Sequence, residues 1–172
     1  MRIDVRKLVC GFIFFCTAGA YPAEAQRVGV GNRAPDIDLP TLNGGRIKLS
    51  KLRDHPVVLS FWGTWCPPCR DEFPELVRLH TKHADDGLII VAINGRDQEL
   101  STKDVQRFVE AFSVSFPVAL DKRGSVRRAY RIEGQPTTIF IDSTGVIRKV
   151  HVGRINRDEL DEGISLILPP RE

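Results

Sequence analysis

Apolar residues recur along this 172-residue chain with two periods, one typical of strands and one typical of amphipathic helices. Residues 36–49 alternate about Asn43 and Gly44, a dipeptide suited to a tight turn, and predict a β-hairpin. Residues 137–142 and 146–152 flank a second turn and are expected to pair antiparallel. The other expected elements are strands at 56–62, 87–94 and 116–120 and helices at 66–82, 104–112, 124–130 and 158–168, the last capped by Asn156.

The order of these elements predicts a mixed α/β fold. A hairpin comes first and is followed by strand, helix, strand and helix. A strand, a short helix, the second hairpin and a final helix complete the chain. A central mixed sheet with helices on both faces satisfies this order. We expect one such domain over residues 26–172, with the first hairpin as an N-terminal extension.

The first 25 residues follow a different pattern. A basic start leads into an apolar run at residues 8–20, and alanines then stand on both sides of Glu24. This layout is typical of a secretory signal peptide, here with cleavage after Ala25. The alternative is an uncleaved membrane anchor, but the apolar run is shorter than the ~20 residues of a spanning helix. We therefore expect an exported protein, in the periplasm or another extracytoplasmic space.

Charge and cysteine content narrow the function further. The formal net charge is only +3 and the basic residues are scattered, so nucleic acid is not an expected partner. Two of the four cysteines, Cys10 and Cys16, lie in the predicted signal peptide. The mature chain would keep Cys66 and Cys69 alone, which is no disulfide framework for an exported protein. We expect a monomer.

Cys66 and Cys69 enclose two prolines in the stretch WCPPC, where a predicted strand ends and a helix begins. A structural zinc site needs four ligands, and the sequence has no second cysteine pair or suitably spaced histidines. A structural staple is disfavoured because so short a loop removes little chain entropy. A redox couple fits better, since a helix N-terminus favours a thiolate at Cys66 and places Cys69 one turn inward. No metal or other cofactor is expected.

The residues around this pair resemble a known family. WCPPC after an apolar strand, with Pro74 five residues beyond the second cysteine, resembles the thioredoxin fold, and GQPTTIFID resembles the segment with its cis-proline. Residues 34–76 resemble the exported TlpA/ResA-like thiol-disulfide oxidoreductases, which are often tied to cytochrome c maturation. The resemblance covers residues 28–168. It implies a thioredoxin-like fold and an enzyme that acts on protein disulfides.

The resemblance also implies roles for particular residues. Cys66 would be the attacking nucleophile and Cys69 the resolving thiol of a redox-active disulfide. Trp65 would frame the site. Gln135 and Pro136, joined by a cis peptide bond, would offer backbone hydrogen bonds to a substrate peptide.

Glu72 lies three residues beyond Cys69, about one helical turn on, where the ResA-like branch carries a functional glutamate. A carboxylate there would raise the pKa of the thiols and could pass protons. The alternative is a solvated glutamate on the helix face. Ser60 stands where thioredoxins proper hold a buried acid, so Glu72 becomes the expected proton handler. Trp62 is expected to be ordinary core packing.

The residues between the cysteines bear on the direction of electron flow. Pro67 and Pro68 have no N–H to offer Cys66, and Glu72 adds a negative charge that Arg70 partly offsets. The thiolate should then be less stabilised than in strong oxidants, which predicts a reductase. Since an exported reductase works in an oxidising compartment, a membrane thiol electron donor of the DsbD/CcdA type is implied.

Two other functions remain open. The APD start is similar to that of peroxiredoxins, which are thiol peroxidases, but Gly63 and Leu59 stand where that family has threonine and proline. A non-catalytic copper-binding chaperone could use the two thiols as ligands. The leading hypothesis is a reductase of protein disulfides, with apocytochrome c or a copper-site assembly protein as its substrate.

Overall fold

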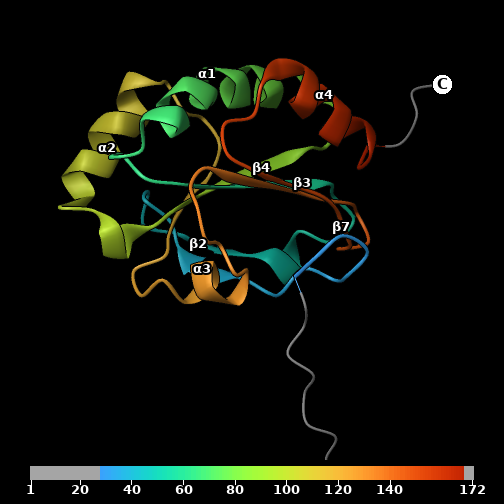
Figure 1. Ribbon diagram of the computed structural model, residues 1–172, viewed down its shortest axis with the longest axis horizontal. Helices are drawn as coiled ribbons and strands as arrows, with labels where there is room; N and C mark the ends of the chain where they lie inside the picture. Colours follow the sequence, from blue (N-terminus) through green and yellow to red (C-terminus); the bar gives the residue numbers. More distant parts are fainter. Residues whose placement is uncertain (1–27, 169–172) are drawn as a thin grey trace, which may run out of the picture.

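A five-stranded mixed sheet forms the centre of the computed structural model, which describes residues 28–168 (Figure 1). Its strands lie in the order β5-β4-β3-β6-β7. The bounds are Val57–Trp62 for β3, Ile89–Asn94 for β4, Val118–Leu120 for β5, Thr137–Ile141 for β6 and Ile147–Val152 for β7. Strands β3, β4 and β5 run parallel, whereas β6 is antiparallel to both β3 and β7. Every residue of the central strand β3 is buried, because helices and loops cover both faces.

Helices lie on both faces of the sheet, as the order of elements predicted. One face carries α1 (Pro67–Lys82), α2 (Thr102–Ala111) and α4 (Arg157–Ser165), and the other carries α3 (Ser125–Ala129) (Figure 1). The N-terminal hairpin of β1 (Asp38–Pro40) and β2 (Arg46–Lys48) lies on the α3 side as a separate two-stranded sheet. Two short 3-10 helices are η1 (Leu49–Lys51) and η2 (Arg96–Gln98). The hairpin is joined to β5 by the Leu42 N–H, which donates to the Val118 carbonyl at 2.8 Å.

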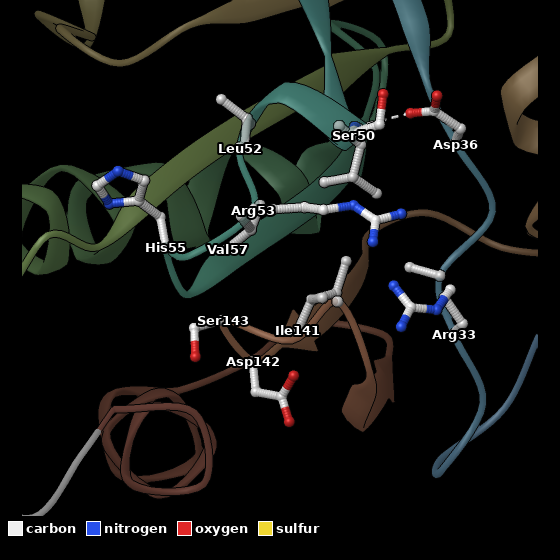
Figure 2. A pocket seen from close by; sticks show the side chains of 13 residues that line it. Arg33, Asp36, Ser50, Leu52, Arg53, His55, Val57, Ile141, Asp142 and Ser143 are labelled. Carbon is white, nitrogen blue, oxygen red and sulfur yellow. Dashed lines mark hydrogen bonds between the residues drawn. The ribbon is translucent and has the colours of Figure 1, made fainter.

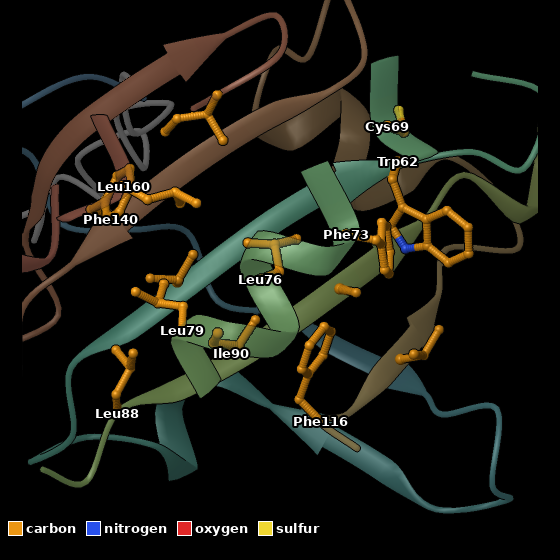
Figure 3. Packing of buried hydrophobic residues seen from close by; sticks show 14 of the residues in the cluster. Trp62, Cys69, Phe73, Leu76, Leu79, Leu88, Ile90, Phe116, Phe140 and Leu160 are labelled. Atoms are coloured by element: carbon orange, nitrogen blue, oxygen red, sulfur yellow. The ribbon is translucent and has the colours of Figure 1, made fainter. Parts of the chain in front are cut away.

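Aromatic rings form much of the core under α1. The Phe73 ring lies 4.7 Å from that of Trp62, centroid to centroid (Figure 3). It lies 4.8 Å from the ring of Phe108. All three side chains are buried. Trp62 is therefore a packing residue, as expected. Such buried aromatic contacts hold the start of α1 against the carboxyl end of β3.

The element boundaries differ from the expected ones by a few residues. The second helix begins at Thr102 rather than Asp104, because Ser101 caps it by accepting a hydrogen bond from the Asp104 N–H at 3.3 Å. Asn156 caps α4 as predicted and forms a reciprocal capping box with Glu159. That helix ends at Ser165, three residues before the expected end.

Some expectations concern segments beyond the described part of the chain. The predicted signal peptide at residues 1–25 lies outside it. Within residues 28–168, no helix combines the length and the apolar character that crossing a bilayer requires.

Candidate active site

Cys66 and Cys69 lie where β3 has ended and α1 begins. They form a disulfide with an S–S distance of 2.05 Å, so the structure describes the oxidised form. Cys66 is the N-cap of α1, and its Sγ accepts a hydrogen bond from the Cys69 N–H at 3.3 Å. Pro67 and Pro68 fill the first helical positions and have no N–H to donate. Both cysteines are buried, at 2% exposed for Cys66 and 0% for Cys69.

The predicted cis-proline lies at the start of β6, whose first residue Thr137 pairs with Phe61 near the end of β3. The peptide bond between Gln135 and Pro136 is cis, and Pro136 directly precedes β6, the neighbour of β3. A Cβ at Gly63 would lie 2.7 Å from the Trp65 indole nitrogen and 3.1 Å from Gln135 Oε1, so both side chains lie over Gly63. The structure thus brings the Cys66 loop and the cis-proline loop together. Trp65 lies over Gly63 and is 52% exposed to solvent.

The backbone near the cis-proline is partly occupied. The Pro136 carbonyl accepts a hydrogen bond from the Gly153 N–H at 2.8 Å. The expected hydrogen bonds to a substrate peptide would therefore fall to the backbone of Gln135, which lies before the first residue of β6.

Glu72 is buried on the inner face of α1, one turn beyond Cys69, and is not the solvated glutamate of the alternative hypothesis. It is 1% exposed, and Ser60 Oγ donates a hydrogen bond to its Oε1 at 3.2 Å. Burial raises the pKa of Glu72 to about 7, while hydrogen bonds from Ser60 and the Ile155 backbone act in the opposite direction. A carboxyl with such a pKa can take up or release a proton near neutral pH.

The connection between β4 and α2 supplies site residues that the sequence analysis did not single out. The Glu99 carboxylate accepts hydrogen bonds from the Thr64 N–H at 2.6 Å, from Asn94 Nδ2 at 2.8 Å and from the Thr64 hydroxyl. Its neighbour Gln98 accepts one from Gln135 Nε2 at 3.4 Å. This connection therefore ties the cysteine loop to the cis-proline loop. Glu99 stands in a polar stretch, and no local pattern signals which loops the fold places beside it.

A hollow lies at the end of β3 opposite to the cysteine pair, around the start of that strand and the end of β6. Arg33, Arg53 and Asp142 are among the residues that line it (Figure 2). Asp142 accepts a hydrogen bond from Arg148 Nε at 2.6 Å. This hollow contains none of the predicted site residues. In the described part of the chain, no group of three or more His, Cys, Asp or Glu residues is placed to hold a metal ion.

Most of the chain is similar to known proteins. Residues 30–150 match the model of the AhpC/TSA family. The thiol-disulfide oxidoreductase ResA of Halalkalibacterium halodurans is 35% identical over 169 residues, which cover 98% of this chain and 94% of ResA. The thioredoxin-like protein YneN of Bacillus subtilis is 37% identical over 143 residues, which cover 82% and 83% of the two chains.

Solved structures show the same fold. One from Chlorobium tepidum, described as the thiol:disulfide interchange protein DsbE, has a TM-score of 0.74 and 34% identity, and the match covers 81% of this chain and 97% of the other. StoA of Bacillus subtilis has a TM-score of 0.67 and 27% identity, with 76% and 97% covered. The thioredoxin-like fold expected from the sequence is confirmed.

Proposed function

Because the chain belongs to the AhpC/TSA family and is a thiol-disulfide oxidoreductase of the ResA type, we propose that Cys66 and Cys69 are its redox couple and that it reduces protein disulfides. The observation that carries this proposal is the disulfide between the two residues at the N-terminus of α1, beside the cis-proline loop. A helix N-terminus stabilises a thiolate, which is the form that attacks a disulfide.

The exchange can be written with its electrons and protons balanced. In the reduced protein, the Cys66 thiol loses its proton, and the thiolate attacks one sulfur of the substrate disulfide. A mixed disulfide forms, and the departing substrate sulfur takes up a proton. Cys69 then gives its proton to the Glu72 carboxylate and attacks Cys66 Sγ. The internal disulfide forms, the second substrate sulfur leaves and takes up the proton held by Glu72, and two electrons and two protons have passed from the protein to the substrate.

Two features of the site favour a reductase over an oxidant. The two prolines after Cys66 cannot donate hydrogen bonds to its sulfur, which leaves the thiolate with fewer stabilising donors than a helix start of ordinary residues would supply. The buried Glu72 carboxyl on the same helix, when ionised, further disfavours a thiolate. A less stabilised dithiol form gives up its electrons more readily, so the reduction potential is lower.

Equilibration with glutathione or dithiothreitol redox buffers tests this direction. We expect a potential below about −200 mV, whereas a value near the −120 mV of the oxidant DsbA would overturn the proposal. Turnover in insulin reduction should accompany it. Consumption of hydrogen peroxide faster than reduction of insulin would favour the thiol peroxidase instead.

The cellular setting is also proposed. The basic and apolar pattern of residues 1–25 supports export with cleavage after Ala25, and an exported reductase needs a membrane dithiol donor of the DsbD/CcdA type. We propose a monomer that serves cytochrome c maturation or copper-site assembly.

N-terminal sequencing of the secreted chain tests the cleavage. A Cys69→Ser variant should retain partners as mixed disulfides through Cys66, and a Cys66→Ser variant, the control, should retain none.

A further inference from the structure

A groove of about 600 Å³ begins at the loop before Cys66 and extends along α2. Its apolar lining includes Trp65, Leu100 and Phe108, and two arginines, Arg70 and Arg107, also border it. It lies on the α2 side of the Trp65 side chain, and neither Gln135 nor Pro136 lines it. The groove therefore lies next to the cis-proline loop, to which its lining residue Gln98 is hydrogen-bonded through Gln135 Nε2 at 3.4 Å, but it does not include that loop.

Leu100 and Trp65 are unusually exposed for large apolar side chains. Leu100 is 98% exposed and Trp65 is 52% exposed, and both line this groove. Large apolar side chains that gather in a hollow next to a reactive centre are typical of a binding surface. Neither Leu100 nor Trp65 belongs to the buried core.

The position of Leu100 is held by its neighbours in the chain. On one side, the Glu99 carboxylate is bound by Thr64 and Asn94, and the Glu99 carbonyl accepts a hydrogen bond from Arg96 Nη1 at 2.9 Å. On the other side, Ser101 caps α2. Leu100 therefore projects from an anchored segment. Little conformational entropy of this segment is lost when a partner binds to it.

Two arginines and two carboxylates, those of Asp104 and Glu99, line the groove. The Glu99 carboxylate already accepts hydrogen bonds from Thr64 and Asn94. Arg107 is paired with Asp104. The Arg70 guanidinium lies over the rings of Phe108 and Phe112, at 5.4 Å and 5.7 Å from their centroids, and residues 28–168 offer it no carboxylate partner within ion-pair distance. One cation at the groove is thus available to a carboxylate of a bound partner.

We propose that this groove docks the segment of the protein substrate next to its reacting cysteine, and that it selects an extended segment with a large apolar side chain and a nearby acidic residue. The inference rests on the proposed function, because the groove would hold a segment whose cysteine reacts with Cys66. Thr64 and Trp65, which line the groove, directly precede Cys66. At about 3.3 Å per extended residue, substrate side chains within three positions of the cysteine reach it.

Peptides that carry one cysteine, blocked as a disulfide with 2-mercaptoethanol, test the proposal. One series places leucine or serine, and a second places aspartate or asparagine, at each of the three positions on either side of the cysteine. The second-order rate constant for reduction by the reduced full-length protein is measured, with hydroxyethyl disulfide as a substrate that has no side chain to dock. At one position or more, the wild type should prefer leucine over serine about tenfold.

Matched variants locate that preference. Leu100→Ser, at a fully exposed position, should abolish the preference for leucine and leave the rates for serine peptides and hydroxyethyl disulfide unchanged. Leu166→Ser, at a leucine 50% exposed beyond the end of α4, should behave like the wild type. Arg70→Gln should remove the preference for aspartate over asparagine.

Different results would overturn the docking site and the proposed reductase function. If the wild type reduces peptides with no preference at any position, or if Leu100→Ser keeps the preference, the docking site is wrong and the reductase stands. If the reduced wild type reduces neither the peptides nor hydroxyethyl disulfide, the proposed function is wrong and the docking site with it.

Discussion

Two glutamates three residues apart on α1 lie in opposite surroundings. Glu72 faces the core, where burial raises its pKa to about 7. Glu75 faces α4, where hydrogen bonds from Arg157 and Arg78 lower its pKa to about 2. The residue type and the helix are the same, so the neighbours on each face of α1 account for the difference. The inner face makes a carboxyl that can exchange protons near neutral pH, and the outer face makes one that stays ionised.

The two faces should affect stability in opposite directions as pH changes. The folded protein holds the Glu72 proton more tightly than the unfolded chain does, so this group lowers the free energy of unfolding as pH rises from about 4.5 to about 7. The folded protein holds the Glu75 proton less tightly, so that contribution is present above about pH 4.5 and is lost as pH falls towards 2. The two pH windows scarcely overlap and can be measured separately.

The largest effect should come from opening the inner face with Phe73→Ala. The Phe73 ring is fully buried against Trp62 and Phe108, so its loss should cost about 3–5 kcal/mol of unfolding free energy in urea denaturation. Water admitted near Glu72 should also bring the pKa of that carboxyl down towards 4.5. A cost below about 1 kcal/mol would show that the inner face is not tightly packed.

Glu72→Gln should remove the pH dependence that belongs to the inner face. Between pH 4.5 and pH 8, the wild type should lose about 3 kcal/mol of stability relative to this variant, because a rise in pKa from 4.5 to about 7 corresponds to that free energy. Reduction of insulin should slow about tenfold or more if Glu72 transfers the Cys69 proton. Parallel pH–stability curves for the two proteins would contradict the burial of an ionisable Glu72.

Ser60→Ala should produce a smaller and more selective change. Ser60 donates to the Glu72 carboxylate and lowers its pKa, so the variant should have a Glu72 pKa higher than that of the wild type. The loss of stability should be about 1–2 kcal/mol at pH 8, where the acceptor is charged, and less at pH 5. NMR titration of labelled glutamate carboxyls and denaturation at both pH values measure these changes. An equal loss at both pH values would mean that the hydrogen bond does not depend on the charge of Glu72.

Glu75→Gln should have the smallest effect. The side chain is 25% exposed and its partner Arg157 is 59% exposed, so solvent screens the pair and the loss at pH 7 should be below about 1 kcal/mol. That difference should shrink with added salt and disappear as pH falls towards 2. Insulin reduction should be unchanged, which makes this variant the matched control for Glu72→Gln. A large loss of activity here would show that the outer face also takes part in the reaction.

The limits of the sequence analysis are clearest on α1 itself. The spacing of its apolar residues predicted the helix, and WCPPC placed the cysteines at its start. The same pattern left open whether Glu72 is solvated, because Glu72 lies at the border of the apolar stripe. Its burial depends on Ser60 from β3 and on Ile155 from the segment before α4.

By itself, the sequence determined the kinds of elements, their order, the cap of the last helix and the identity of the cysteine pair. These properties depend on residues close together in the chain, where periodicity and side-chain chemistry are read directly. Only the tertiary structure decided which carboxyl is buried and which loops meet at the site. The decisive contacts join residues 12, 35 and 82 positions apart, in the bonds of Ser60 to Glu72, Thr64 to Glu99 and Arg157 to Glu75. No local pattern encodes such contacts, because packing of distant segments sets the water access and the partners of each group.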